Sequence, residues 1–348
     1  MVSALIEKLL SGKSLTGDES FGVMSEIFEG KVLPVQIAGL LVALRAKGET
    51  AQEIAGFARA MRNAMTVLSS EHPVVADTCG TGGDAMGTFN LSTAAALVAA
   101  GCGVPVAKHG NRSVSSKCGS ADVLESCGVK VDMSKETAQK CLSETGITFL
   151  FAPLYHPAMK HAAPVRRELG VRTVFNLLGP TVNPARANAQ VIGVPRKSLV
   201  PLMAQVLLEL NKDRSYSAIV LHEKMYDEVV LCGKCEIAEV SSGRVRRYEL
   251  IPKDFALKRS DPDILKGGDA KTNAQTMRAL LSGNGHPLED VVSANAALAL
   301  YCAEKASRSS LKDSIKKQLP ELVTRAREAI RNRSALKKLD LLIERSGQ

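Results

Sequence analysis

The sequence predicts an α/β protein in which a small helical N-terminal domain precedes a larger domain with a mainly parallel central sheet flanked by helices. Apolar residues recur at helical spacing over the first 65 residues, and no strand pattern interrupts them. From about residue 74, short apolar runs alternate with helical stretches, which is typical of parallel strands joined by crossover helices. The length of 348 residues, 45% of them hydrophobic, suits two domains.

Four short helices account for the first domain, which we place at residues 1–68. Thr16 with Glu19, and Thr50 with Glu53, form capping-box patterns that mark two of the helix starts. Each helix carries an apolar stripe with a period near 3.6 residues, so its apolar face needs a partner. The four stripes consist of Val2, Leu5, Ile6 and Leu9; Phe21, Met24, Ile27 and Phe28; Ile37, Leu40, Leu41 and Leu44; and Ile54, Phe57, Ala58 and Met61.

The second domain, residues 74–348, begins with alternating strands and helices. We expect strands at 74–76, 104–107, 129–131, 147–151, 191–194 and 218–221, separated by helices that begin near residues 92, 121, 134, 156 and 202. The pattern then becomes hairpin-like over 229–240 and 244–250, with Gly233-Lys234 and Ser242-Gly243 as turns. Two helices, near 272–282 and 288–306, and a basic tail complete the chain.

The net charge of +9 suggests a nucleic-acid partner, but its distribution argues against one. Residues 304–348 carry 12 Lys or Arg and 6 Asp or Glu, which is +6 of that charge, and a solvated basic helical tail explains it. The 5 Tyr and 8 Phe interleave no basic stretch, as base stacking would require. We therefore expect no nucleic-acid partner. The alternative is a protein that is related to an enzyme but has no catalytic activity, and that binds DNA through its basic surface in a salt-dependent way.

Apolar runs and cysteines indicate the compartment. The sequence holds no run of 18 apolar residues and no cationic segment ahead of a long apolar core near its start, so we expect neither a membrane span nor a secretory leader. The eight scattered cysteines are typical of reduced thiols, which predicts a cytoplasmic protein. Cys232 and Cys235 form a CxxC pair on an expected hairpin turn, without a second pair, and we interpret them as ordinary thiols.

A glycine-rich segment after the first expected strand, residues 77–84 (DTCGTGGD), predicts a phosphate site. Glycines let the backbone approach an anion and turn its N–H groups toward phosphate oxygens. Asn90, Ser92 and Thr93 then open a helix, which adds side-chain donors and the positive end of the helix dipole. A Walker A loop is excluded because Asp84 stands at its end, and a dinucleotide loop because residues 95–107 lack the acid that would bind the ribose.

A second polar segment, residues 108–116 (KHGNRSVSS), lies at the end of the next expected strand. Parallel strands present their C-terminal loops at the same edge of a sheet, so we expect the two segments to converge. Lys108 and the hydroxyls of Ser115 and Ser116 would add charge and donors for a polyphosphate. His109 alone is equally consistent with a structural hydrogen bond.

Two further candidates are charged. Asp227 and Glu228 are adjacent acids between apolar runs, and paired carboxylates beside a polyphosphate suggest Mg²⁺. A solvated pair of loop residues is an equally good interpretation of the sequence alone. Arg166 lies beside Arg167 on an expected helix, so one of the two should face solvent.

Together these motifs resemble the anthranilate phosphoribosyltransferase family. The similarity rests on residues 77–84, 90–93 (NLST), 108–116, 119–125 (GSADVLE) and 172–184 (RTVFNLLGPTVNP), and it runs from about residue 5 to residue 305. It implies transfer of the 5-phosphoribosyl group from phosphoribosyl pyrophosphate to the amino group of anthranilate, with Mg²⁺, giving N-(5-phosphoribosyl)anthranilate and diphosphate in tryptophan biosynthesis. It also implies a nucleoside phosphorylase/phosphoribosyltransferase-like fold, and a homodimer formed through the helical domain with part of 165–190 packed on it. Association with other tryptophan-pathway subunits would follow from the same resemblance.

The resemblance assigns roles to individual residues. Ser92, Asp227 and Glu228 would be metal ligands. No residue would act as a catalytic acid or base, and Lys108 and Asp84 would instead contribute to catalysis electrostatically. The anthranilate contacts would be Gly80, His109, Asn111 and Arg166, whose guanidinium suits a carboxylate. Phosphoribosyl pyrophosphate would be held by Gly80, Thr81, Gly82, Gly83, Asp84, Thr88, Asn90, Ser92, Thr93, Lys108, Ser115, Ser116 and Ser120.

The sequence departs from the family pattern in a few places. Cys118 replaces a usual serine, and the tail beyond about residue 305 is longer than typical. Residues 222–226 (HEKMY) stand where the family has a glycine-rich His-Gly-x-Asp-Gly-Leu run, so the loop before Asp227 differs. The nearest enzymatic alternative is a pyrimidine-nucleoside phosphorylase, which shares the general architecture but differs at the two polar segments.

Overall fold

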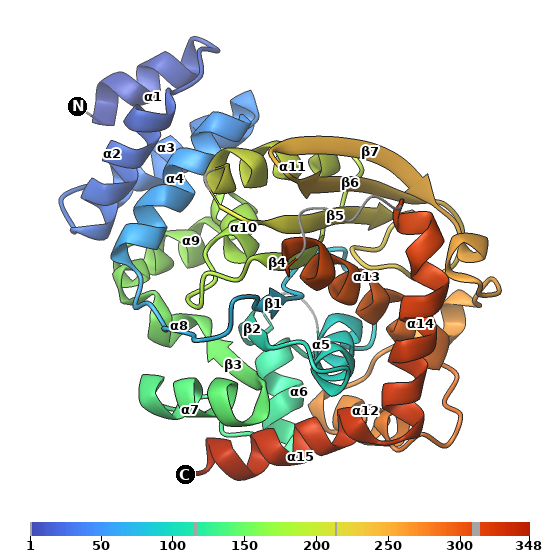
Figure 1. Ribbon diagram of the computed structural model, residues 1–348. Helices are drawn as coiled ribbons and strands as arrows, with labels where there is room; N and C mark the ends of the chain where they lie inside the picture. Colours follow the sequence, from blue (N-terminus) through green and yellow to red (C-terminus); the bar gives the residue numbers. More distant parts are fainter. Residues whose placement is uncertain (1, 114–116, 213, 308–313) are drawn as a thin grey trace.

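A bundle of four helices forms one side of the molecule (Figure 1). The computed structural model describes residues 2–113, 117–212, 214–307 and 314–348. Both predicted capping boxes are present: the hydroxyls of Thr16 and Thr50 accept from the backbone N–H groups of Glu19 and Glu53, whose side chains accept from the cap N–H groups in return. The bundle consists of α1 (Val2–Leu10), α2 (Gly17–Phe28), α3 (Pro34–Lys47) and α4 (Ala51–Ala64).

A seven-stranded sheet occupies the centre, in the order β3-β2-β1-β4-β5-β6-β7. Strands β1 to β5 pair in parallel, and β6 and β7 continue the sheet as antiparallel strands. Because β2 and β4 flank β1 on opposite sides, the chain reverses its direction of travel across the sheet at β1, which is where open α/β sheets bind ligands. The strands are β1 (Ala76–Asp77), β2 (Val106–Gly110), β3 (Ile147–Phe151), β4 (Ala189–Gly193), β5 (Ser217–Glu223), β6 (Cys235–Ser241) and β7 (Arg244–Leu250).

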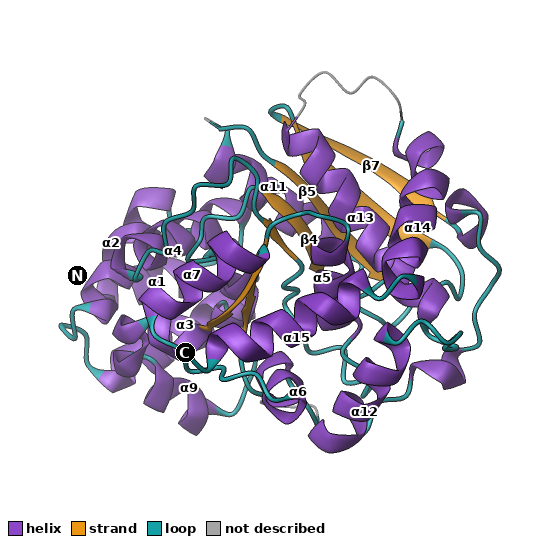
Figure 2. Ribbon diagram, turned by 60° about the horizontal axis from the view of Figure 1, so that its bottom comes forward, coloured by secondary structure: helices purple, strands orange, loops and turns teal. Residues whose placement is uncertain are grey.

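Helices cover both faces of the sheet, as Figure 2 shows. Alternate side chains of β4 and β5 enter different cores: Val191 and Ile219 pack in the core that contains α5 and α13, and Ile192 and Val220 in the core shared by α11 and the helical bundle. The bundle is therefore joined to one face of the sheet. The remaining helices are α5 (Leu91–Gly101), α6 (Ser120–Cys127), α7 (Lys135–Thr145), α8 (Ala152–Tyr155), α9 (Ala163–Leu169), α10 (Phe175–Leu178), α11 (Leu199–Asn211), α12 (Ala270–Leu281), α13 (Glu289–Ser307), α14 (Ile315–Arg331) and α15 (Ser334–Ser346).

Two predicted strand segments are wrong. Residues 129–131 continue the end of α6, where Gly128 has a φ of 105° and the N–H of Val129 donates to the carbonyl of Leu124. The N–H of Lys130 donates to Ser346 Oγ, so these backbone groups are not available to a sheet. Residues 229–234 form a loop, and β6 begins at Cys235, so Gly233-Lys234 is not a hairpin turn. The predicted turn at Ser242-Gly243 is confirmed, with φ angles of 50° and 69°.

The C-terminal tail is helical, as predicted, but it is not merely solvated. Helices α14 and α15 bury Leu319, Ile330 and Leu339 in the core beside α5 and α13. The predicted helix over 156–169 is instead divided into a short 3₁₀ turn (Pro157–His161) and α9. Pro157 disfavours helical backbone at His156, and Pro164 has no N–H with which to continue a helix from the preceding turn. Among the described residues, the helices all fall short of the length and apolar character needed to cross a bilayer.

Candidate active site

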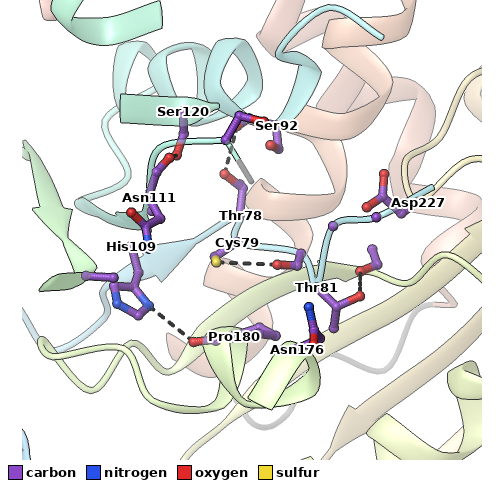
Figure 3. A pocket seen from close by; sticks show the side chains of 18 of the residues that line it. Thr78, Cys79, Thr81, Ser92, His109, Asn111, Ser120, Asn176, Pro180 and Asp227 are labelled. Atoms are coloured by element: carbon purple, nitrogen blue, oxygen red, sulfur yellow. Dashed lines mark hydrogen bonds between the residues drawn. The ribbon is translucent and has the colours of Figure 1, made fainter. Parts of the chain in front are cut away.

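A cavity of about 730 Å³ opens at the carboxyl ends of the central strands. Both polar segments predicted from the sequence line it, together with the acidic pair 227–228, so their predicted convergence is confirmed (Figure 3). Ser115 and Ser116 lie outside the described residues. The predicted site residues that line the cavity are Gly80, Thr81, Gly82, Gly83, Asp84, Thr88, Asn90, Ser92, Thr93, Lys108, His109, Asn111, Ser120, Arg166, Asp227 and Glu228.

Asp77, the last residue of β1, ties the two polar segments together. Its buried carboxylate accepts hydrogen bonds from the backbone N–H groups of Cys79 (3.1 Å) and His109 (3.3 Å) and from Asn183 Nδ2 (2.8 Å). Burial raises the pKa of Asp77 to about 6, although the nearby Lys108 opposes this effect. No role was predicted for Asp77. Its one sequence signal is its position at the start of the glycine-rich segment.

Arg172 holds the glycine-rich loop in place. Its guanidinium donates to the carbonyl oxygens of Gly82 (2.9 Å) and Gly83 (2.8 Å). Gly83 has a φ of 87°, a conformation that favours glycine, and a Cβ there would lie 1.5 Å from Arg172 Nη1. The backbone conformation therefore favours glycine at position 83, and a side chain there would displace the Arg172 guanidinium. Arg172 also lines the cavity, and the sequence signal for it was its place at the start of the 172–184 motif.

Three carboxylates, from Asp84, Asp227 and Glu228, gather in the cavity. The backbone N–H of Ser92, in the first turn of α5, donates to Glu228 Oε1 (2.9 Å). Burial raises the pKa of Asp227 well above its usual value, and the charges of Glu228 and Asp84 add to the increase. Burial also raises the pKa of Glu228 to about 7. Such a cluster ionises fully only when positive charge is supplied to it.

The acidic cluster fits a hard divalent cation. Asp84 Oδ2 is buried and has no hydrogen-bond donor among the described residues, and carboxylate and hydroxyl oxygens are the ligands that Mg²⁺ prefers. No set of three His, Cys, Asp or Glu side chains in the described part of the chain is arranged to hold a metal unaided. This agrees with an ion held by one or two carboxylates and completed by substrate phosphates and water.

His109 is held in one neutral form. Its Nδ1 lies 3.2 Å from the carbonyl oxygen of Gly179, and because a carbonyl only accepts, Nδ1 carries the proton. Its Nε2 lies 3.2 Å from His156 Nε2, which must therefore be the donor. Burial lowers the pKa of His109 to about 3 and that of His156 to about 4. Both rings therefore line the cavity as uncharged groups at neutral pH.

Arg166 contributes a guanidinium without an acidic partner among the described residues. It lies on α9, with its guanidinium carbon 4.9 Å from the centroid of the Phe175 ring. Burial lowers its pKa, and no neighbouring acid offsets that effect. Arg167 is exposed, so one arginine of the pair faces solvent, as predicted. A partly buried guanidinium without an acidic partner among the described residues favours binding of a carboxylate.

Comparisons with known proteins cover nearly the whole chain. Residues 3–65 match the helical bundle domain of a glycosyl transferase family, and residues 72–336 match the a/b domain of such a family. An anthranilate phosphoribosyltransferase from Pelotomaculum thermopropionicum is 51% identical over 306 residues, which are 88% of each chain. Another, from Desulforamulus reducens, is 47% identical over 345 residues, covering 99% of this chain and 96% of that one. The similarity thus extends beyond residue 305, where the sequence predicted its end.

Two solved structures of relatives have the same architecture. The anthranilate phosphoribosyltransferase from Thermus thermophilus superposes with a TM-score of 0.89 at 43% identity, over 99% of both chains. The one from Saccharomyces cerevisiae, in complex with PRPP and Mg, has a TM-score of 0.87 at 26% identity, over 99% of this chain and 98% of that one. The predicted fold class, a helical bundle followed by an α/β domain with a mainly parallel sheet, is confirmed.

The neutral histidine pair predicts how stability changes with acidity. The unfolded ring titrates near pH 6.5 but folded His156 near pH 4, so below pH 6.5 the unfolded chain binds more protons and the folded state loses stability. For His156 this loss should be about 2 kcal/mol between about pH 7.5 and about pH 5. His156→Gln keeps a donor for His109 without this titration, so its free energy of unfolding should fall less on acidification. Urea unfolding of the substrate-free protein at both pH values measures the difference.

The matched control for this experiment is His161→Gln, because the His161 side chain is only partly buried. This variant should show the same acid-side loss of stability as the wild type. An identical loss in the wild type and His156→Gln would contradict the buried neutral pair.

Proposed function

The chain belongs to the anthranilate phosphoribosyltransferase family, and we propose that the cavity at the carboxyl ends of the central strands binds both substrates of that reaction. The activity is transfer of the 5-phosphoribosyl group of phosphoribosyl pyrophosphate to the amino group of anthranilate, in tryptophan biosynthesis. The observation that carries the proposal is that the cavity brings together a phosphate-type loop, an acidic cluster and an unpaired guanidinium. These features are complementary to a diphosphate, its cation and a carboxylate.

Phosphoribosyl pyrophosphate is proposed to lie along the glycine-rich loop and the start of α5. The positive end of the α5 dipole and the loop N–H groups favour the diphosphate there. Lys108 is buried and donates to Thr78 Oγ1 (3.2 Å) and to the Thr78 carbonyl oxygen (3.5 Å), which leaves one ammonium hydrogen for an anion. The proposed contacts are Gly80, Thr81, Gly82, Gly83, Asp84, Thr88, Asn90, Ser92, Thr93, Lys108 and Ser120, with Ser115 and Ser116 from the second segment.

Mg²⁺ is the proposed cofactor, with Ser92, Asp227 and Glu228 as its protein ligands. The yeast relative was solved with PRPP and Mg, and the half-buried acidic cluster of this chain has the charge to retain such an ion. When bound, Mg²⁺ offsets the negative charge that grows on the departing diphosphate. Asp84, whose Oδ2 has no donor among the described residues, would orient water around it.

Anthranilate is proposed to bind between the second polar segment and α9. The Arg166 guanidinium would pair with the anthranilate carboxylate, and His109, Asn111 and Gly80 would contact the ring and its amino group. Phe175 and Pro180 add apolar surface to the same part of the cavity. An aromatic acid matches this combination of one unpaired cation and an apolar wall.

The mechanism requires no strong acid or base from the chain. The bond between ribose C1 and the pyrophosphate oxygen breaks with its electron pair going to diphosphate, and positive charge develops on the sugar ring. Lys108 and the loop N–H groups stabilise the growing negative charge. The anthranilate nitrogen then bonds to C1 and releases a proton to solvent. Holding that nitrogen in line with C1 supplies the entropic part of the rate.

A homodimer formed through the helical bundle is also proposed. Helices α1 and α3 pack together and carry exposed apolar side chains, among them Leu10, Val35 and Val42. Exposed apolar residues gathered on one unit are typical of a subunit interface. A cytoplasmic location is proposed because the structure records all eight cysteines as free thiols.

A fluorescence assay tests the proposed function. Anthranilate fluorescence should decline when the protein, phosphoribosyl pyrophosphate and Mg²⁺ are all present, and should stay constant when any one is omitted. Phosphorolysis of a pyrimidine nucleoside, or salt-dependent DNA binding without loss of anthranilate, would instead support one of the two alternatives.

Removing the charges of the acidic pair should affect turnover more than anthranilate binding. For the double variant Asp227→Asn with Glu228→Gln we expect kcat to fall by about 10²–10³-fold, because charge on the leaving diphosphate is no longer offset. The Michaelis constant for anthranilate should change by less than about threefold. Steady-state kinetics at saturating phosphoribosyl pyrophosphate measures both, and equal losses in the two quantities would argue against a role in diphosphate departure.

Arg166→Ala should mainly weaken anthranilate binding, because the substrate carboxylate loses a charge-assisted partner. We expect the Michaelis constant for anthranilate to rise by about 10–100-fold. Arg167→Ala removes the same charge from the exposed neighbour and should leave this constant unchanged. An unchanged constant in Arg166→Ala would refute the proposed carboxylate contact.

A further inference from the structure

The loop that follows the acidic pair is held almost entirely by two side chains. Five successive backbone N–H groups, those of residues 229–233, all donate to side-chain oxygens of Glu223 and Asn295. The N–H of Val229 donates to Asn295 Oδ1 (3.1 Å), those of Val230 (2.9 Å) and Leu231 (3.2 Å) to Glu223 Oε2, and those of Cys232 (2.6 Å) and Gly233 (2.8 Å) to Glu223 Oε1. This pattern replaces the strand pairing that the sequence predicts for the same residues.

Glu223 is buried, and its carboxylate is held by backbone N–H groups. Its exposed fraction is 1%, and it forms no ion pair with any residue in the described ranges. A carboxylate has two oxygens, which accept about four hydrogen bonds, and four backbone N–H groups occupy them here. Hydrogen bonds to a charged acceptor are the strong ones, so the negative charge is balanced by the loop backbone itself. Loss of the carboxylate would leave three buried N–H groups and one partly buried N–H group without acceptors.

The acidic pair, residues 227–228, lies between two residues whose backbone is hydrogen-bonded to other parts of the structure, Tyr226 and Val229. On its N-terminal side, Glu223 and Tyr226 exchange backbone hydrogen bonds of 3.1 and 2.8 Å. On its C-terminal side, Asn295 of α13 both accepts from the N–H of Val229 and donates to its carbonyl oxygen (2.7 Å). Both flanks of residues 227–228 are therefore attached to the central strand β5 or to the long helix α13.

This anchoring opposes a real electrostatic force. Asp84, Asp227 and Glu228 crowd three carboxyl groups into one cavity, and water outside the cavity would solvate each of them better. The backbone of Asp227 also lies against β4, since a Cβ on Gly193 would be 1.4 Å from the Asp227 carbonyl oxygen. If the N–H groups of residues 229–233 had no acceptors, this loop could adopt other conformations in which the acids leave the cavity. Because all five N–H groups are bonded, far fewer such conformations are available to it.

We propose that Glu223 and Asn295 are positioning residues that hold Asp227 and Glu228 in the cavity for the cation and diphosphate. Glu223 is not among the residues that line the cavity, whereas Asn295 does line it. Both act on the acidic pair through the loop backbone, Glu223 at residues 230–233 and Asn295 at residue 229. The inference rests on the proposed function of the acidic pair. It adds the part of the chain that sets the orientation of that pair.

The substitution Glu223→Gln tests the proposal, because it keeps the size of the side chain but turns two acceptor sites into N–H donors. Hydrogen–deuterium exchange of the substrate-free protein should show residues 230–233 exchanging at least about tenfold faster than in the wild type. Calorimetric titration with Mg²⁺ plus phosphoribosyl pyrophosphate should show binding weakened by about tenfold. In kinetics, kcat should fall and the Mg²⁺ requirement rise, while the Michaelis constant for anthranilate stays within about twofold.

Glu239→Gln is the matched control. Glu239 is also a buried glutamate, but it accepts from the hydroxyls of Tyr301 (3.0 Å) and Tyr248 (3.1 Å), away from the loop. Glu239→Gln makes the same chemical change as Glu223→Gln. It should alter neither the exchange rate at residues 230–233 nor the Mg²⁺ requirement. If Glu223→Gln does not fold, Asn295→Ala serves instead, since it removes one anchor and leaves the glutamate. It should give the same split between Mg²⁺ requirement and anthranilate binding.

Unchanged exchange at residues 230–233 in Glu223→Gln would overturn the proposal. An equal rise in the Michaelis constant for anthranilate and in the Mg²⁺ requirement would also overturn it, because such a result indicates general loosening of the cavity. The exchange measurement uses no substrate. A wild-type protein without transferase activity would therefore refute the proposed function, while the exchange data would still decide whether Glu223 anchors the loop.

Discussion

The buried carboxylate of Asp77 is the interaction on which the cavity depends. It stands at the end of the strand where the chain reverses across the sheet, and it accepts hydrogen bonds from both polar segments and from Asn183. Three segments distant in sequence are thereby fixed to one charged group. Without it, the two polar segments would still share an edge of the sheet and the hydrogen bonds from Lys108 to Thr78, but Asn183 would no longer be joined to them through one group.

The ligands of the cavity can be inferred from charges that the protein leaves unbalanced. Burial raises the pKa of both Asp227 and Glu228, which shows that the chain places acids together without enough positive charge to ionise them freely. Burial lowers the pKa of Arg166, because this guanidinium has no negatively charged partner among the described residues. A cation at the acids and a carboxylate at the arginine would correct both. Substrate binding is therefore favoured by the same electrostatic terms that make the empty cavity unfavourable.

The sequence predicted those features that are governed by local rules. The capping boxes of α2 and α4, strand β3 and the turn at Ser242-Gly243 follow from local propensity and spacing, and the structure confirms them. Convergence of the two polar segments follows from the parallel sheet. The strand predicted over residues 229–234 is wrong because an apolar run with β-branched residues has the sequence pattern of a strand. In the structure the N–H groups of residues 229–233 donate instead to the side chains of Glu223 and Asn295. Arg172 was not identified for the same reason, since its partners are backbone carbonyls, which no sequence pattern reveals.

Backbone groups held by distant side chains also explain how the helical bundle bears on the chemistry. Arg45 of α3 donates to the carbonyl oxygen of Arg172, and the guanidinium of Arg172 donates to Gly82 and Gly83. A displacement of the bundle relative to the sheet would therefore act on the loop proposed to hold the diphosphate. The acidic pair is anchored differently, to β5 and α13 inside the larger domain. The glycine-rich loop is thus attached to the sheet through Asp77 and Gly193 and, through Arg172, to the bundle as well, whereas these anchors of the acidic pair all lie in the larger domain.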